Sequence, residues 1–142
     1  MQLLIKAKRM RGFYTPLCLV FLICVQSQSS FAYLLPVSRY ESDGSLFVES
    51  TSIANRGDAV FLTYVENFNQ AQAYGELSYQ SKATNIRIDC SGRRVFALSE
   101  YFYSDPDRSG KLLGAFPLSD QFGSYAEHGS WVSELVNIGC QL

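Results

Sequence analysis

Apolar and polar residues alternate along much of the chain between residues 45 and 116, which is the pattern of β-strands with one buried face. The clearest stretch alternates Ile86, Ile88 and Cys90 with Arg87 and Asp89. Other segments are rich in β-branched and aromatic residues, and clusters of turn-forming residues separate them. The pattern predicts six strands, at residues 45–53, 59–65, 74–81, 83–90, 95–103 and 111–116.

The connections between the predicted strands are short, which is typical of an antiparallel sheet. Residues 45–53 and 59–65 are expected to form a hairpin. The polar residues 67–73 are expected to break the strand pattern, and residues 33–44 to lead into the fold. The prediction therefore places no strand before residue 45.

The pattern becomes helical after residue 129. Trp131, Leu135 and Ile138 fall at i, i+4 and i+7, and Val residues beside them widen the apolar stripe. Ser130 is a suitable N-cap, and Glu134 lies early enough to favour the positive end of the helix dipole. We expect Trp131 to belong to the core rather than to stack on a ligand. The predicted fold class is α+β: a six-stranded antiparallel sheet with a C-terminal α-helix packed on it.

The N-terminal segment has the three parts of a cleavable secretory signal. Four basic residues are followed by an apolar run of about 13 residues, which is shorter than the roughly 20 needed to span a bilayer. The small residues Ser30 and Ala32 precede the expected cleavage point, between Ala32 and Tyr33. The chain is thus expected to consist of a signal peptide, 1–32, and one domain, 33–142.

The four cysteines divide between these two parts. Cys18 and Cys24 would leave with the signal, and neither follows the small residue that an acylated cysteine requires, so no lipid anchor is expected there. Cys90 and Cys140 remain as one pair in a protein bound for an oxidising compartment. Only one intramolecular disulfide is available to them. Two distant cysteines do not form a zinc site, so no metal is expected.

Removal of the signal changes the net charge. The four basic residues lost with it leave eight basic side chains against 13 acidic ones, a net charge of −5. Nucleic acids and anionic membranes attract basic surfaces, so neither is an expected partner. After cleavage no membrane span is expected either.

Catalytic motifs are missing from the sequence. His128 is the single histidine, and it lies beside Gly129 without a nucleophile motif near it. Asp105 and Asp107 flank Pro106, which favours an ordinary turn over a cation site. We therefore expect no catalytic residue and no cofactor, and a protein that is not an enzyme.

Two groups of residues leave a binding role open. Arg93 and Arg94 either contact an acidic partner or merely flank the turn after Cys90. The aromatic residues of the strands suit either an interface or the core of a small sheet. They are Tyr74, Tyr79, Tyr101, Phe102 and Tyr103.

Several segments in order resemble the surface-adhesin protein E-like domain family, found in exported proteins of Gram-negative bacteria. The matching pieces span residues 46–140 and include Asn55-Arg56-Gly57, Tyr79-Gln80-Ser81-Lys82, Ile88-Asp89-Cys90, Gly110, and the final helix from Gly129-Ser130 to Cys140. The two cysteines and their contexts are the most specific of them. The resemblance implies a six-stranded antiparallel sheet with a C-terminal helix tied back by the Cys90–Cys140 disulfide.

The resemblance also implies a function. Its best-known member adheres to host matrix and serum proteins through a basic segment and tends to dimerise, which leaves a homodimer open here. The comparable stretch contains Lys82, Arg87, Arg93 and Arg94, which become the candidate partner-binding residues. We expect a protein partner of unknown identity, with a host extracellular protein as one option. The expected location is the periplasm or the cell surface and outer membrane, not the cytoplasm; a periplasmic structural or accessory protein is the alternative function.

Overall fold

The computed structural model describes residues 33–38, 43–119 and 123–141, all of which belong to one compact unit, Phe31–Leu142. The predicted signal peptide and its cleavage point after Ala32 lie outside the described residues. They therefore stay predictions.

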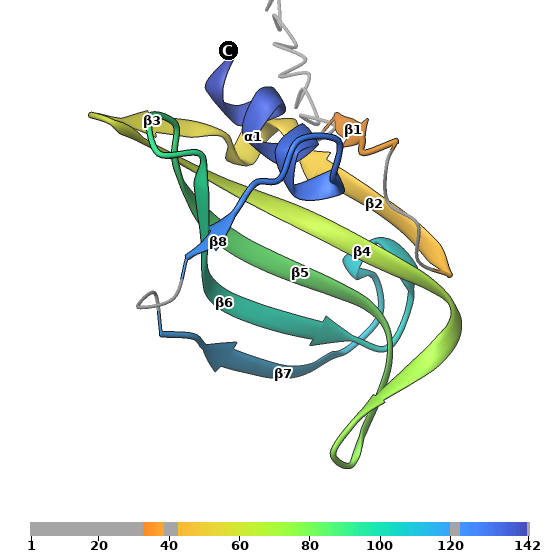
Figure 1. Cartoon of the computed structure of the whole chain (residues 1–142). Coiled ribbons are helices and arrows are strands. Elements are labelled where there is room, and N and C mark those ends of the chain that lie inside the picture. The colour runs from red at the N-terminus through yellow and green to blue at the C-terminus, as the bar shows by residue number, and fades with distance from the viewer. Residues whose placement is uncertain (1–32, 39–42, 120–122, 142) are drawn as a thin grey trace, which may run out of the picture. The chain divides into compact units, whose positions relative to one another are not determined.

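A single antiparallel sheet forms the body of the described chain (Figure 1). Its main path runs β1-β2-β4-β5-β6-β7, and two short strands are added to it, β3 beside β4 and β8 beside β6. Among the described residues the sheet has eight strands, so the prediction of six was wrong in number but right in its antiparallel arrangement. The strands are β1 Leu34–Pro36, β2 Gly44–Glu49, β3 Ala54–Arg56, β4 Ala59–Tyr74, β5 Leu77–Asp89, β6 Arg94–Tyr103, β7 Leu112–Pro117 and β8 Ser124–Tyr125.

Strands β4 and β5 form the centre of the sheet, and both are longer than predicted. The polar residues 67–73 continue β4 instead of breaking it, and the two strands expected at 74–81 and 83–90 are one strand. The backbone pairing between β4 and β5 shifts register between Asn67 and Gln72, so extra residues are absorbed as a bulge without ending the ladder. Backbone pairing with β5 continues through these polar residues although their side chains do not favour a strand, which is why composition misplaced the boundaries.

The short strands escaped prediction because two or three residues show no periodicity. The predicted lead-in contains β1, whose Leu34 pairs with Glu49 of β2. Gly57, at φ 61°, turns the chain between β3 and β4, a backbone conformation that favours glycine. The 3₁₀ turns η1, Ser50–Ser52, and η2, Pro106–Arg108, complete the connections.

The C-terminal helix α1, Trp131–Cys140, begins as predicted at the N-cap Ser130, whose hydroxyl accepts the backbone N–H of Ser133 at 3.1 Å. A carboxylate oxygen of Glu134 in its first turn accepts two hydrogen bonds from Ser38, from its backbone N–H at 3.0 Å and its hydroxyl at 2.9 Å. The helix thereby holds the start of the domain. Cys140 is the last residue of the helix.

One face of the sheet, which we call the inner face, packs against α1 and forms the core (Figure 1). Leu135 and Val136 of the helix are 0 % and 2 % exposed. Trp131 packs against this core, as predicted. The sheet contributes Leu46, Val48, Val60, Leu62, Tyr64, Ile86 and Ile88. The opposite face, the outer face, carries the alternate residues of the same strands.

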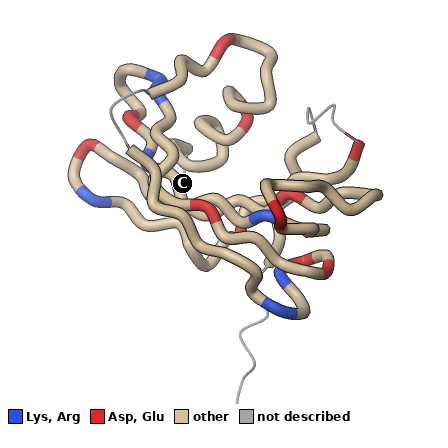
Figure 2. Tube along the Cα trace, turned by 90° about the horizontal axis from the view of Figure 1, so that it is seen from below, with Lys and Arg blue, Asp and Glu red and all other residues tan. Residues whose placement is uncertain are grey.

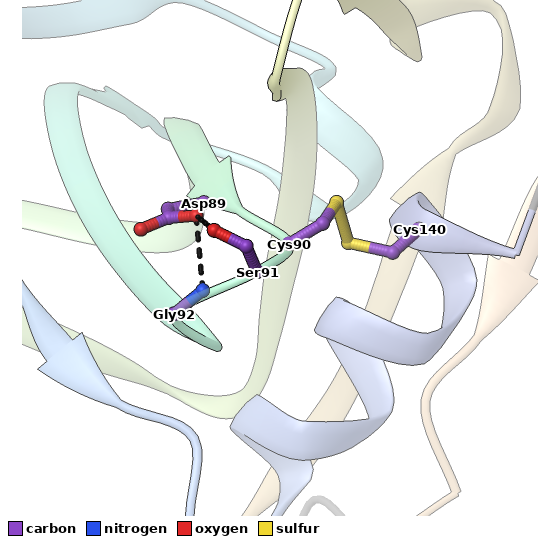
Figure 3. The surroundings of a disulfide bond; sticks show 5 residues. All are labelled: Asp89, Cys90, Ser91, Gly92 and Cys140. Carbon is purple, nitrogen blue, oxygen red and sulfur yellow. Dashed lines mark hydrogen bonds between the residues drawn. A yellow bond between two sulfur atoms is a disulfide. The ribbon is translucent and has the colours of Figure 1, made fainter.

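Cys90, just after β5, and Cys140 form the predicted disulfide, with a Cα–Cα distance of 5.8 Å (Figure 3). The bond ties the last turn of α1 to the central strand over a sequence separation of 50 residues. Gly139 lies beside it, where an added Cβ would come within 3.1 Å of Ile88 and 3.2 Å of Leu62. The helix therefore approaches the sheet closely where the disulfide holds it.

Replacing both Cys90 and Cys140 with Ser is expected to lower the free energy of unfolding by about 4 kcal/mol, because the unfolded chain loses a loop constraint of this length. Guanidinium denaturation of the exported wild type and of the variant, monitored by the fluorescence of the single tryptophan, measures the difference. Equal midpoints would show that the helix is held by packing alone.

Candidate binding surfaces

The four predicted partner-binding residues do not form one patch. Lys82 lies on the inner face, whereas Arg87, which pairs with Phe96, lies on the outer face. Arg93 and Arg94 lie at the turn between β5 and β6, with Arg94 exposed and Arg93 half-buried. Figure 2 shows basic positions dispersed among acidic ones rather than gathered in one place. A single basic binding segment, as implied by the resemblance, therefore receives no support from their placement.

Lys82 is the centre of a partly buried ion-pair cluster. Its Nζ lies 2.8 Å from Glu66 Oε2 and 3.2 Å from Glu100 Oε1. The three side chains are 19 %, 10 % and 23 % exposed, respectively. An ammonium group shared by two carboxylates is poorly available to a partner, so the cluster is a structural element of the inner face beyond the end of α1.

The pKa values of two groups in this cluster are perturbed. Burial raises the pKa of Tyr64 to about 12, and the Glu66 carboxylate adds to the effect. Burial alone would lower the pKa of Lys82, but Glu66, with smaller contributions from Tyr64 and Glu100, more than offsets it and raises the pKa above its ordinary value. Tyr64 is therefore kept neutral and Lys82 charged in the folded state.

A cluster of aromatic rings lies where β6, β7 and the β4–β5 hairpin meet. Phe102 of β6 is 2 % exposed, and Tyr74 stacks on it with ring centroids 5.1 Å apart. Tyr79 and Phe116 meet Phe102 edge to face at 4.7 Å and 5.6 Å. Tyr74 and Phe116 nevertheless remain 52 % and 36 % exposed. Of the two roles open for the aromatic residues, Phe102 thus belongs to the interior and Tyr74 to the surface.

Two hollows flank α1. One, of about 470 Å³, lies beside the disulfide and has Asn55, Asp58 and Ser91 in its lining. Asp89 faces away into the adjoining turn, where its carboxylate accepts hydrogen bonds from Ser91 and Gly92 that lower its pKa (Figure 3). The second hollow, of about 160 Å³, lies between the helix and the sheet and is mainly apolar.

The remaining candidates from the sequence are Asp105, Asp107 and His128, and the two aspartates take part in hydrogen bonds that hold a turn in place. Asp107 and Asn67 exchange two hydrogen bonds, at 2.6 Å and 2.8 Å, and the carbonyl of Asp105 accepts one from Ser81 at 2.6 Å. Both aspartates thereby fasten η2 to the sheet. His128 is exposed before α1.

In residues 33–38, 43–119 and 123–141, no group of three or more His, Cys, Asp or Glu side chains is arranged to hold a metal ion. Among the same residues, no helix combines the length and the apolar character needed to cross a membrane.

Sequence reasoning did not identify the aromatic cluster, nor the position of β7 at the end of the sheet that the described strands form. Leu112 and Phe116 were assigned to a strand, but their exposure depends on β7 being at the end of the sheet. The sequence signal for an unusual edge strand was the lack of any charged residue in Leu112–Pro117.

Raising the pH from about 10 to about 12 is expected to destabilise the protein through Tyr64. The pKa of Tyr64 in the folded state exceeds its value of 10.0 in the unfolded state. The stability that neutral Tyr64 contributes is therefore complete below pH 10 and is lost as the pH approaches 12. The two-unit difference corresponds to about 3 kcal/mol. Tyr64→Phe should therefore lose less stability than wild type over this interval in denaturant titrations, whereas Tyr125→Phe, at a 62 % exposed position, should follow wild type. Parallel losses in all three proteins would contradict the assignment.

Comparisons with known proteins bear on this geometry. The family model for surface-adhesin protein E matches residues 34–141. A solved structure of Haemophilus influenzae protein E superposes with a TM-score of 0.61 at 15 % identity, covering 78 % of this chain and 84 % of that one. Its crystal form II gives 0.58 at 16 %, covering 68 % and 80 %. The protein from non-typeable Haemophilus influenzae gives 0.58 at 14 %, covering 76 % and 75 %.

A comparison with curated proteins found no match. The solved structures establish a shared fold, and the family model covers nearly all of the described sheet and helix. The chain belongs to the surface-adhesin protein E family.

Proposed function

We propose that this chain is an exported, non-enzymatic binding module of the cell envelope that holds a protein partner along the free edge of β7. The supporting observation is the exposed, uncharged edge strand beside the aromatic cluster. Family membership supports an adhesin-like role at the cell surface. A host extracellular protein is the partner that this role suggests.

Strand β7 has the features of a strand-addition site. Its ladder partner among the described strands is β6, so its other side presents backbone N–H and C=O groups. Natural edge strands usually carry charges that prevent pairing, whereas Leu112–Pro117 has none and Pro117 lies at its end. An extended segment of a partner can add to such an edge through main-chain hydrogen bonds.

The aromatic cluster gives that edge a means of selecting its partner. Phe116 projects from β7, and its ring lies 5.5 Å from that of Tyr74 on the neighbouring hairpin. Partly exposed aromatic rings beside a buried one resemble the anchor residues that dominate protein interfaces. Leu112, 48 % exposed, extends the apolar surface along the strand.

Protease shaving of intact cells tests the location. We expect the chain beginning at Tyr33 to be lost while a periplasmic control survives, because an adhesin must lie outside the outer membrane. Protection until the outer membrane is opened would contradict the adhesin role and favour the alternative, a periplasmic accessory protein.

Charged substitutions in β7 test the interface. Leu112→Lys with Phe116→Lys should weaken binding to an immobilised panel of host matrix and serum proteins by at least about tenfold, because charges on an edge oppose strand addition. The matched control is Tyr33→Lys with Tyr125→Lys, which changes two residues that are 70 % and 62 % exposed outside β7.

Sedimentation of the same proteins separates partner binding from self-association. Wild type could bind no panel member and yet form a dimer. If the β7 variant then stays a monomer, a second copy of the chain occupies the edge. Equal binding by the β7 variant and the control pair would remove β7 from the interface.

A further inference from the structure

The hairpin of β3 and β4 carries the tripeptide Arg56-Gly57-Asp58 at its tip. Arg56 pairs with Ala59 across the hairpin, so the turn itself consists of Gly57 and Asp58. The φ angle of Gly57 is 61°, and the favoured two-residue hairpin turns require a positive φ at this position. A turn this short between paired strands holds its residues in one conformation, so little conformational entropy is lost when a partner binds it.

The tip of this hairpin is uncovered. Arg56, Gly57 and Asp58 are all exposed, and a Cβ added at Gly57 would have no heavy atom of the described chain within 4 Å. Figure 1 shows the tip projecting from the body of the sheet. The hollow of about 470 Å³ opens between this turn and the last turn of α1. A partner can therefore approach the tip without displacing another described element.

The two charged side chains of the tip are available to a partner. No ion pair or side-chain hydrogen bond among the described residues involves Arg56 or Asp58. Arg56 has one ring contact, in which its guanidinium carbon lies 5.2 Å from the Phe61 centroid. At an exposed position such a contact is weaker than the paired hydrogen bonds of a guanidinium with a carboxylate, so an acidic group can draw Arg56 away from the ring.

We propose that the Arg56-Gly57-Asp58 turn binds a host receptor that holds a divalent cation beside an acidic pocket. The Asp58 carboxylate supplies oxygen ligands of the kind that Mg²⁺ and Ca²⁺ prefer. The Arg56 guanidinium can form paired hydrogen bonds with a carboxylate in the pocket. Gly57 between them has no side chain, so the receptor can approach the backbone closely. The integrins that recognise Arg-Gly-Asp in matrix proteins have this chemistry.

A purely acidic or purely basic partner fits this turn less well, because one of the two opposite charges would repel it. A cation beside an acidic pocket matches both charges. The β4–β5 hairpin offers a comparison, because its turn, Gly75-Glu76, also begins with a glycine of positive φ, 58°, and ends with an exposed acidic residue. Tyr74 stands there in place of the arginine. Of these two turns, only the β3–β4 turn places opposite charges on both sides of the glycine.

This site is separate from the β7 interface. Strand β3 joins the sheet at β4, whereas β7 is the last strand beyond β6. The inference therefore goes beyond the proposed function. It shares with that function only a location outside the cell, and a test with purified proteins does not depend on that location.

The test is surface plasmon resonance with the purified extracellular parts of the fibronectin-receptor and fibrinogen-receptor integrins, both of which recognise Arg-Gly-Asp. The exported, disulfide-bonded protein is the analyte. We expect saturable binding to one or both integrins in Mg²⁺ and its loss in EDTA, because the Asp58 carboxylate binds through the cation. A linear Arg-Gly-Asp peptide should compete, and an Arg-Gly-Glu peptide should not.

Variants connect binding to the turn. Asp58→Glu keeps the charge but moves the carboxylate by one methylene, so it should weaken binding by at least about tenfold. Arg56→Lys keeps the charge but loses the planar paired donors, so it should also weaken binding. The matched control is Glu76→Gln, which removes a negative charge from the other glycine turn and should stay within about twofold of wild type.

Four results would overturn the proposal. They are no binding to either integrin, binding that persists in EDTA, equal affinities of Asp58→Glu and wild type, or equal losses in Asp58→Glu and Glu76→Gln. Circular dichroism of each variant checks that the sheet is intact. Leu112→Lys with Phe116→Lys should bind the integrins as wild type does, so failure of the β7 interface and failure of this site are distinguishable.

Discussion

Strands β4 and β5 pair over most of their length, and the alternation of their side chains assigns each residue to one of two faces. Ile86 and Ile88 face the helix, whereas Asn85 and Arg87, which alternate with them, face outward. A slip of one residue would exchange the two sets and bury the arginine. The long central ladder thereby places the core and the ion-pair cluster on the inner face and the Arg87–Phe96 contact on the outer face, and the other strands extend this division.

The helix closes only part of the inner face, and different interactions stabilise the two parts. Apolar packing of Leu135 and Val136 and the Cys90–Cys140 bond hold the end beneath α1. Beyond the helix, Lys82 and its two carboxylates occupy the face instead. A partly buried ion pair is costly to desolvate, and removing one partner usually destabilises more than the pair itself contributes. The cluster is therefore better understood as fixing the arrangement of these strands than as a main source of stability.

The parts of the fold that were predicted correctly depend on local signals. Ser130 and the 3.6-residue spacing after it define α1, and the alternation before Cys90 defines the C-terminal half of β5. The full length of β4, the strands β1 and β8, and the surroundings of Lys82 depend on pairing between distant residues, which no local pattern carries. Glu66 and Glu100 are 16 and 18 residues from Lys82 along the sequence, and the register of three strands brings them together.

The same reasoning explains why the basic residues could not be assigned from sequence as a single binding segment. Lys82 and Arg87 are five positions apart, and an odd separation along a strand puts two side chains on opposite faces. Lys82 is consequently committed to the ion-pair cluster, while Arg87 aligns with residues of β3, β4 and β6 that are distant in sequence. The outward set of these strands is not uniformly exposed either, because Val65 and its cross-strand partner Ala83 are 2 % and 1 % exposed. The role of each basic side chain therefore depends on what covers its own position in the sheet and not on its charge alone.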